Sequence, residues 1–190
     1  LTKKESPTII KRRFLDQVDS KKVLGVYSIN DESLNKRDET NFLEKLDKLV
    51  AEHDLVIVSD YGHGIITSQV AEHISKTDKF VSLNAQVNAA NIGTHSIRKY
   101  HDINCLIINS SELRHELRDR ESGVEILMKQ LAENLLARNL VVTHGSRGAT
   151  LYTAQNDEYY HCPAFATKVV DKIGAGDAML ALLSCSLKNR

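Results

Sequence analysis

The sequence lacks a surplus of charge of either sign and lacks any long apolar run. Its 190 residues include 25 basic and 25 acidic side chains, so the formal net charge is zero. A neutral chain has no general electrostatic attraction to nucleic acid or to an anionic membrane surface, and we expect neither as its partner. The longest apolar runs are too short to cross a bilayer, and no signal peptide is visible.

Cysteine is scarce as well, and the histidines are scattered. The three cysteines, Cys105, Cys162 and Cys185, are widely spaced and odd in number, a pattern typical of reduced thiols in the cytoplasm. The eight histidines show no spacing that suits metal ligands, so the sequence predicts no transition-metal site. No internal repeat or low-complexity tract appears, and the length suits one domain with a sizeable core.

The sequence does contain a regular alternation of strand-like and helix-like segments. Continuous apolar runs predict buried parallel strands at residues 55–58, 80–83, 105–108 and 140–143. Segments with helical spacing of apolar residues lie between them at 37–53, 67–76 and 122–137. Two later segments, 149–153 and 158–162, predict antiparallel edge strands, and 8–16 with 23–29 predict a hairpin with one wet face. The alternation indicates an α/β fold with a mainly parallel sheet flanked by helices.

A glycine-rich stretch near the end carries the most chemical information. Gly174, Ala175 and Gly176 precede Asp177 and an apolar run. Such a turn at the start of a helix directs backbone N–H groups and the positive end of the helix dipole at one spot, which suits a phosphate. A carboxylate there either accepts a proton from an attacking hydroxyl or is an ordinary charge partner of a helix N-terminus.

Polar residues also follow the predicted strands, where open α/β sheets bind ligands. Asp60 either contacts a substrate or caps a helix, and Asn84 either contacts a ligand or belongs to a loop held by side-chain turns. Asn109 and Glu112 have the spacing of a helix-capping pattern and also the oxygen donors that suit Mg²⁺.

The stretch Val-Asp-Lys-Ile-Gly-Ala-Gly-Asp-Ala, residues 170–178, resembles the signature of the ribokinase-like (PfkB) family of sugar and nucleoside kinases. The resemblance implies that Gly174, Ala175 and Gly176 form an anion hole and that Asp177 is the catalytic base. Lys172 stands where the family usually has Thr, near its monovalent-cation site, and this departure leaves activation by such a cation open.

Further segments match the family in order. Asn109-Ser-Ser-Glu112 matches its Asn-x-x-Glu motif, which implies that Asn109 and Glu112 organise Mg²⁺ and its waters. Val-Thr-His-Gly-Ser-Arg-Gly, residues 142–148, matches a nucleotide loop and implies ATP contacts from Thr143, Gly145, Ser146 and Gly148.

The substrate side also shows a resemblance. Ser-Asp-Tyr-Gly-His-Gly, residues 59–64, resembles the Asp-Tyr-x-Lys-Gly segment of heptose-phosphate kinases, with His63 in place of the Lys. This implies that Asp60 lies beside the substrate. In the kinases that the chain resembles, the strand end at Asn84 approaches the sugar or the nucleotide, which implies that Asn84 also contacts the substrate. The hairpin resembles the returning half of the β-lid of the family, which implies a homodimer through the lid. Arg12 then either touches a phosphorylated sugar or is a solvated edge charge.

We therefore expect a ribokinase-like, Rossmann-like fold, with residues 1–30 in the lid and residues 31–190 in an α/β core that is incomplete at both ends. The resemblance implies a cytoplasmic phosphotransferase that uses ATP and Mg²⁺ to phosphorylate a hydroxyl of a sugar or sugar phosphate. Two alternatives remain: a non-catalytic ligand-binding or dimerisation domain, which the substitutions Lys172 and His63 favour, and a nucleoside kinase.

Overall fold

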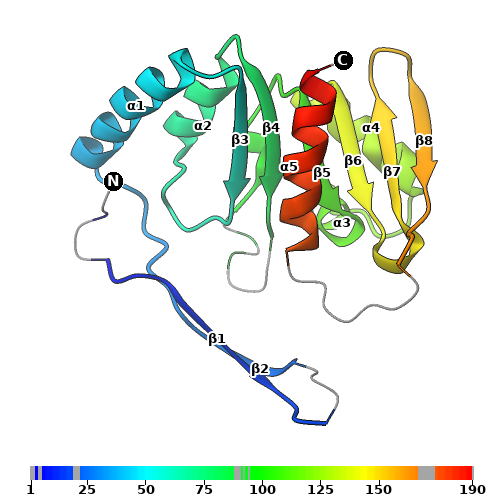
Figure 1. Ribbon diagram of the computed structural model, residues 1–190, viewed down its shortest axis with the longest axis horizontal. Coiled ribbons are helices and arrows are strands. Elements are labelled where there is room, and N and C mark those ends of the chain that lie inside the picture. Colours follow the sequence, from blue (N-terminus) through cyan, green and yellow to red (C-terminus); the bar gives the residue numbers. More distant parts are fainter. Residues whose placement is uncertain are drawn as a thin grey trace.

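A computed structural model describes residues 3, 6–18, 22–87, 91, 93, 95–166 and 174–189. These residues form a six-stranded sheet flanked by helices and a separate two-stranded hairpin (Figure 1). The substitution at Lys172 and part of the asparagine-rich segment that begins at Asn84 lie outside the described residues.

The main sheet is ordered in space as it is in the sequence. Its strands are β3 (Leu55–Asp60), β4 (Phe80–Ala85), β5 (Cys105–Asn109), β6 (Asn139–Thr143), β7 (Ala149–Thr153) and β8 (Glu158–Cys162). The strands from β3 to β6 are parallel, whereas β7 and β8 pair antiparallel at one edge. This arrangement confirms the mainly parallel sheet that the sequence predicts.

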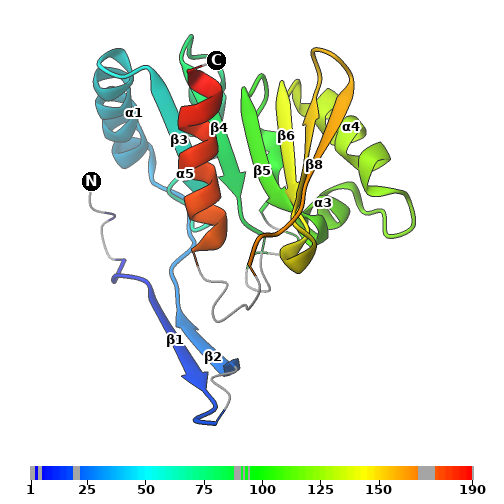
Figure 2. The ribbon, with the colours of Figure 1, turned by 45° about the vertical axis from the view of Figure 1, so that its right-hand side comes forward.

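Helices cover both faces of this sheet (Figure 2). They are α1 (Lys36–Ala51), α2 (Ser68–Ser75), α3 (Ser110–Leu117), α4 (Val124–Leu135) and α5 (Ala175–Lys188), with two single turns, η1 (Ile97–Lys99) and η2 (Gly145–Arg147). The sequence predicts α4 over 122–137, but the helix is shorter because Leu136 adopts a left-handed φ of 51°.

The two faces of β5 show how period-two alternation builds a core on each side of the sheet. Leu106 and Ile108 point into a large apolar cluster with residues of α2, α3 and α4. Cys105 and Ile107 point the other way, into a smaller cluster that includes Leu180 of α5. Among the described helices, α5 therefore lies alone on its face, packed across β3, β4 and β5.

The hairpin consists of β1 (Ile10–Leu15) and β2 (Lys22–Ser28), which pair antiparallel with an irregularity between Phe14 and Leu15. It projects away from the body of the molecule beyond the lower edge of the sheet (Figures 1 and 2). Nearly all its side chains are exposed. The expected hairpin is thereby confirmed, but the expectation of one wet face is wrong, because side chains on both faces of the ribbon are exposed.

Of the helices in the described part of the chain, none has the length and apolar character that crossing a membrane requires.

Candidate active site

The structure brings the candidate site residues to the carboxyl edge of the parallel strands. Asp60 is the last residue of β3, Asn109 of β5 and Thr143 of β6. Tyr61 is the residue directly after β3, and its hydroxyl lies 3.3 and 3.4 Å from the two carboxylate oxygens of Asp177. The first turn of helix α5 therefore lies at the carboxyl edge of the sheet, where β3, β5 and β6 end.

The N-terminus of α5 is open to solvent. Gly174 precedes the helix with a left-handed φ of 79°, and no side chain of the described residues caps the first turn. Asp177 and the two residues before it are exposed. Among the described residues, a Cβ added at Gly176 would meet nothing within 4 Å. Backbone N–H groups at an uncapped helix start are donors suited to an anion, and the open space leaves room for one.

Asp60 lies inside the protein. It is 4% exposed, and its Oδ2 lies 2.6 Å from Lys99 Nζ and accepts a hydrogen bond from Tyr100 at 2.8 Å. Its Oδ1 accepts from the Gly62 N–H at 2.9 Å, so Asp60 holds a turn and caps no helix. Burial alone would raise the pKa of Asp60, but the bonds from Lys99, Gly62 and Tyr100 hold this pKa below its ordinary value. The ionised carboxylate is thus engaged within the protein.

His63, which stands where the related kinases have Lys, is held against Tyr61. The two rings are stacked, with centroids 6.4 Å apart and planes 14° apart. Both ring nitrogens are buried, with no hydrogen-bond partner among the described residues. Burial, together with the nearby charge of Lys11, lowers the pKa of His63. His63 is therefore neutral near pH 7 and does not supply the positive charge of a Lys.

Asn84 lies where β4 and β5 separate. The backbones of these strands pair only at Ser82 with Cys105 and at Leu83 with Leu106. Beyond that point, Asn84 Nδ2 donates to the Ile107 carbonyl oxygen at 2.7 Å and replaces a backbone bond. The sheet is thus opened toward its carboxyl edge and held open by a side chain.

Asn109 and Glu112 form a reciprocal cap on α3. Asn109 Oδ1 accepts from the Glu112 N–H, and Glu112 Oε2 accepts from the Asn109 N–H, each at 2.9 Å. Burial raises the pKa of Glu112, although hydrogen bonds from the backbone N–H groups of Asn109 and Val87 oppose the shift. The structure therefore contains the helix cap that the spacing of Asn109 and Glu112 allows.

Asn109 and Glu112 also offer the hard oxygen donors that suit Mg²⁺, which retains several waters and needs few direct ligands. The described residues contain no cluster of three or more His, Cys, Asp or Glu side chains that would enclose a metal ion. These donors fit a mostly hydrated Mg²⁺, and a metal role for them stays a prediction.

The loop after β6 folds tightly under β8. Gly148 has a φ of 92°, and a Cβ there would lie 2.0 Å from the Cys162 carbonyl oxygen, so only glycine fits. Gly145 and Ser146 of this loop are exposed, and Thr143 is half-buried. Gly145 and Ser146 are therefore accessible to a ligand, and the ATP contacts of this loop stay a prediction.

A chain of polar contacts connects this loop to α4 through β7 and β8. His144 Nε2 lies 3.0 Å from Thr150 Oγ1, which lies 3.1 Å from His161 Nδ1. His161 Nε2 in turn lies 3.2 Å from a carboxylate oxygen of Glu125 on α4. Thr150 is 4% exposed, so its hydroxyl depends on these partners. Sequence reasoning missed this chain because its members come from four separate elements.

Tyr61 was also missed as a site residue, although its position in the Asp-Tyr motif directly after a strand was a usable signal. Lys11 of the hairpin lies over its ring, 5.0 Å from the centroid. Arg12 is the next residue of β1, so its side chain points to the opposite face of the ribbon. Lys11, and not Arg12, is thus the residue of β1 that reaches Tyr61.

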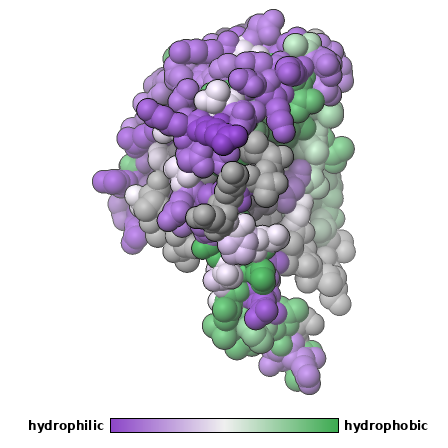
Figure 3. All heavy atoms as spheres, turned by 90° about the vertical axis from the view of Figure 1, so that its left-hand side faces the viewer, coloured by the Kyte–Doolittle hydropathy of each residue, from purple (hydrophilic) through white to green (hydrophobic). Residues whose placement is uncertain are grey.

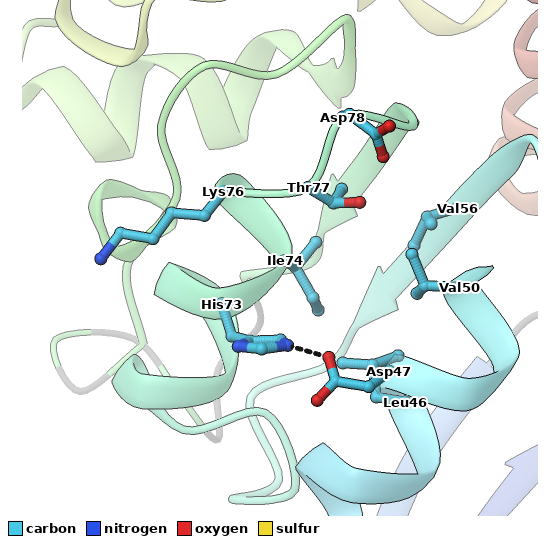
Figure 4. A pocket seen from close by; sticks show the side chains of 9 residues that line it. All are labelled: Leu46, Asp47, Val50, Val56, His73, Ile74, Lys76, Thr77 and Asp78. Atoms are coloured by element: carbon cyan, nitrogen blue, oxygen red, sulfur yellow. Dashed lines mark hydrogen bonds and ion pairs between the residues drawn. The ribbon is translucent and has the colours of Figure 1, made fainter.

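Two hollows lie elsewhere. One, of about 500 Å³, lies between α1 and α2, where His73 Nε2 is 2.5 Å from Asp47 Oδ1 and apolar side chains such as Ile74 lie nearby (Figure 4). The other, of about 770 Å³, is lined by Ser111, Arg114, His115, Arg118 and Arg120 on α3 and the following turn. Neither includes Asp177.

Comparisons with known proteins bear on the family and the fold of the chain. A family model described as "pfkB family carbohydrate kinase" matches residues 18–189. The chain is 30% identical over 164 residues to the bifunctional protein HldE of Trichlorobacter lovleyi, covering 82% of this chain and 32% of that protein. It is 28% identical over 187 residues to HldE of Haemophilus influenzae, covering 95% of this chain and 36% of that protein. The chain therefore spans about a third of the length of these curated relatives.

Solved structures show the same fold. A ribokinase from Arabidopsis thaliana, complexed with ribose and ATP, superposes with a TM-score of 0.68 at 19% identity, covering 98% of this chain and 58% of that one. A ribokinase from Thermotoga maritima gives a TM-score of 0.70 at 17% identity, covering 97% and 57%. These structures confirm the ribokinase-like fold that the sequence predicts.

Proposed function

The chain belongs to the pfkB family of carbohydrate kinases, and from that membership we propose that it forms the core of an ATP-dependent kinase that phosphorylates a hydroxyl of a sugar or sugar phosphate. One observation carries the proposal. An exposed carboxylate, Asp177, stands in the first turn of an uncapped helix, at the edge where β3, β5 and β6 end. A proton acceptor beside an anion site is what transfer to a hydroxyl requires.

In the proposed reaction, the substrate oxygen attacks the terminal phosphorus of ATP while Asp177 accepts the hydroxyl proton. The bond from phosphorus to the bridging oxygen of ADP breaks, and ADP leaves with both electrons. The N–H groups of Gly174, Ala175 and Gly176 bind the equatorial oxygens of the transferring group, where they stabilise its charge. The phosphates of ATP need a counter-charge, and Mg²⁺ supplies it when bound beside Asn109 and Glu112.

The loop after β6 is proposed to bind ATP through Thr143, Gly145, Ser146 and Gly148. The exposure of Gly145 and Ser146 supports this assignment, because both are accessible at the edge that carries Asp177. The hydrogen-bonded chain through Thr150 is proposed to hold His144, and with it the loop, in one orientation.

For the substrate, we propose a phosphorylated sugar of the heptose class. The Asp-Tyr segment after β3 and the similarity to HldE proteins support this class. Asp60 contributes by fixing the loop after β3, and Asn84 by holding the strands apart beside it. Arg12, exposed on the hairpin, is also proposed to contact the substrate phosphate; it lies on the ribbon face opposite Lys11, so this contact requires the hairpin to present its other face to the substrate.

We also propose a cytoplasmic homodimer that forms through the hairpin. One face of the ribbon carries Ile10, Phe14, Leu24 and Val26, which are 45%, 52%, 54% and 48% exposed. Figure 3 shows apolar side chains gathered on this projecting hairpin. A second copy of the hairpin would bury this face.

A phosphoacceptor screen on the native full-length protein tests the proposed reaction. Sugar phosphates with six and seven carbons, the corresponding free sugars and nucleosides are each offered with ATP and Mg²⁺, and ADP release is measured. We expect turnover with a sugar or sugar phosphate and none in the Asp177→Asn variant. Turnover only with nucleosides would favour a nucleoside kinase. Binding of ATP or sugar phosphate without turnover would favour the non-catalytic domain.

A further inference from the structure

We propose that Tyr61 is the residue that positions Asp177, and that it links the proposed base to the hairpin through Lys11. This inference rests on the proposed function, because it requires Asp177 to act on the substrate hydroxyl. Tyr61 acts through Asp177 and is therefore a positioning residue.

The contact between the two side chains is symmetric. The Tyr61 hydroxyl lies 3.3 Å from Asp177 Oδ1 and 3.4 Å from Oδ2, so it donates to both oxygens together. Among the described residues, Tyr61 is the one side chain that hydrogen-bonds Asp177. An exposed aspartate in a first helical turn otherwise samples several rotamers, and this contact favours the one in which both oxygens face Tyr61.

Tyr61 itself is fixed from several directions. Its carbonyl oxygen accepts from Asn91 Nδ2 at 3.0 Å, and its ring stacks on His63. The preceding residue, Asp60, is buried and bound to Lys99. Because these contacts fix the loop after β3, the Tyr61 hydroxyl is held in place beside the Asp177 carboxylate of α5.

The protonation state of Tyr61 suits a donor. Burial, and next the negative charge of Asp177, raise the pKa of Tyr61 above its ordinary value of 10.0. The hydroxyl keeps its proton at neutral pH. It donates to the carboxylate that is proposed to accept the substrate proton.

Lys11 adds the link to the hairpin. Its Nζ lies 5.0 Å from the centre of the Tyr61 ring, at a distance typical of a cation–π contact. Movement of β1 relative to the sheet separates Lys11 from this ring. Tyr61 thus contacts both Lys11 of the hairpin and the carboxylate of Asp177.

The kinetic test compares Tyr61→Phe with Tyr159→Phe in the native full-length protein. Tyr159 is the matched control because its hydroxyl donates to the Glu125 carbonyl oxygen, on a different part of the sheet. We expect Tyr61→Phe to lower kcat about tenfold, with KM for ATP unchanged, because the carboxylate loses its fixed orientation. Tyr159→Phe keeps the wild-type kcat. An unchanged kcat in Tyr61→Phe would overturn the positioning role.

A second readout needs no kinase activity. Tyrosine labelled at Cζ with ¹³C is titrated by NMR, and the Tyr61 signal is assigned by its absence in Tyr61→Phe. We expect the pKa of Tyr61 to fall in Asp177→Asn, since the negative charge that raises it is removed. No change in this pKa would show that the contact is absent in solution. A wild-type protein without phosphotransfer would refute the proposed function, while this titration would still decide the contact.

A third variant tests the link to the hairpin. Lys11→Gln removes the charge over the Tyr61 ring, and Lys22→Gln is its control because Lys22 bonds Tyr27 within the hairpin. We expect kcat to fall about threefold in Lys11→Gln and to stay unchanged in Lys22→Gln. Equal kcat values in the two variants would remove Lys11 from the proposal.

Discussion

Asn109 and Glu112 each accept a hydrogen bond from the backbone N–H of the other, and both bonds are 2.9 Å long. The two residues proposed to organise Mg²⁺ are therefore also the cap of α3. A single carboxylate has two tasks here, and a variant must separate them.

Glu112→Gln separates metal binding from capping because an amide oxygen still accepts the Asn109 N–H. We expect turnover to fall and the Mg²⁺ concentration at half-maximal rate to rise. The control is Glu121→Gln, an exposed residue outside the cap. If the Mg²⁺ dependence does not change, the role of Glu112 is capping alone.

The same variant should alter the pH dependence of stability. Burial raises the pKa of Glu112 in the folded protein. The contribution of Glu112 to the free energy of unfolding is therefore most favourable below its unfolded-state pKa of about 4.3, and it is lost as pH rises through the folded-state pKa. Urea unfolding should therefore show Glu112→Gln gaining stability relative to wild type between pH 4 and pH 7. A parallel pH dependence of the two proteins would contradict this.

Asp177→Asn should lower turnover by roughly 10²–10⁴, the usual cost of removing a general base. ATP affinity should hold or improve slightly, because a negative charge beside the phosphates is gone. Stability should change little, since Asp177 is exposed. Steady-state kinetics and ATP-binding calorimetry on one preparation check both effects, with Glu133→Gln on α4 as the control. Wild-type turnover in Asp177→Asn would exclude it as the base.

Asp60→Asn should destabilise the protein by about 3 kcal/mol at pH 7, because Lys99 would lose its partner in a buried pair. Because the pKa of Asp60 is lowered in the folded protein, its carboxylate contributes to the free energy of unfolding above its unfolded-state pKa of about 3.9. This contribution is lost as pH falls through the folded-state pKa. The loss in Asp60→Asn should therefore shrink below pH 4. In the double variant with Lys99→Met, the total loss should be smaller than the sum of the single losses. Additive losses would show that the two residues do not interact.

Two threonines of β7 provide a matched pair. Thr150 lies between His144 and His161, whereas the Thr153 hydroxyl is buried with no partner among the described residues. Thr150→Val should cost about 1 kcal/mol and weaken ATP binding, since His144 loses its support. Thr153→Val should be neutral or slightly stabilising. Equal unfolding midpoints and equal ATP affinities would show that the chain through Thr150 is not maintained.

The proposed dimer predicts that Phe14→Ser yields a monomer. Phe14 is 52% exposed on the apolar face of the hairpin, and sedimentation equilibrium reports the mass directly. Val18→Ser is the control, because Val18 is 94% exposed outside both strands of the hairpin. A dimer that persists in Phe14→Ser would place the interface elsewhere.

Local pattern was sufficient for most of the fold. The strands Ala149–Thr153 and Glu158–Cys162 occur at the boundaries that the sequence predicts, because alternation and turn residues specify an antiparallel pair locally. The parallel strands were equally recognisable, since burial on both faces leaves a continuous apolar run.

The site was predictable only in part. Motif order placed Asp60, Asn109 and Asp177 after strands or at a helix start, but sequence spacing contains no information on which way a side chain points. The inward orientation of Asp60 depends on Lys99 and Tyr100, which are far from it in the sequence. The approach of Tyr61 to Asp177 likewise follows from the packing of α5 across the sheet, which no local pattern describes.

The strand order of the main sheet has a consequence for synthesis of the chain. Because each strand from β4 onward lies beside its predecessor, its pairing partner has already left the ribosome when it emerges, and the sheet can assemble strand by strand. Helix α5 departs from this order, since it packs on β3, β4 and β5. The contact between Tyr61 and Asp177 spans 116 positions. The strands of the sheet are therefore all synthesised before the proposed base, which joins Tyr61 only when α5 packs on them.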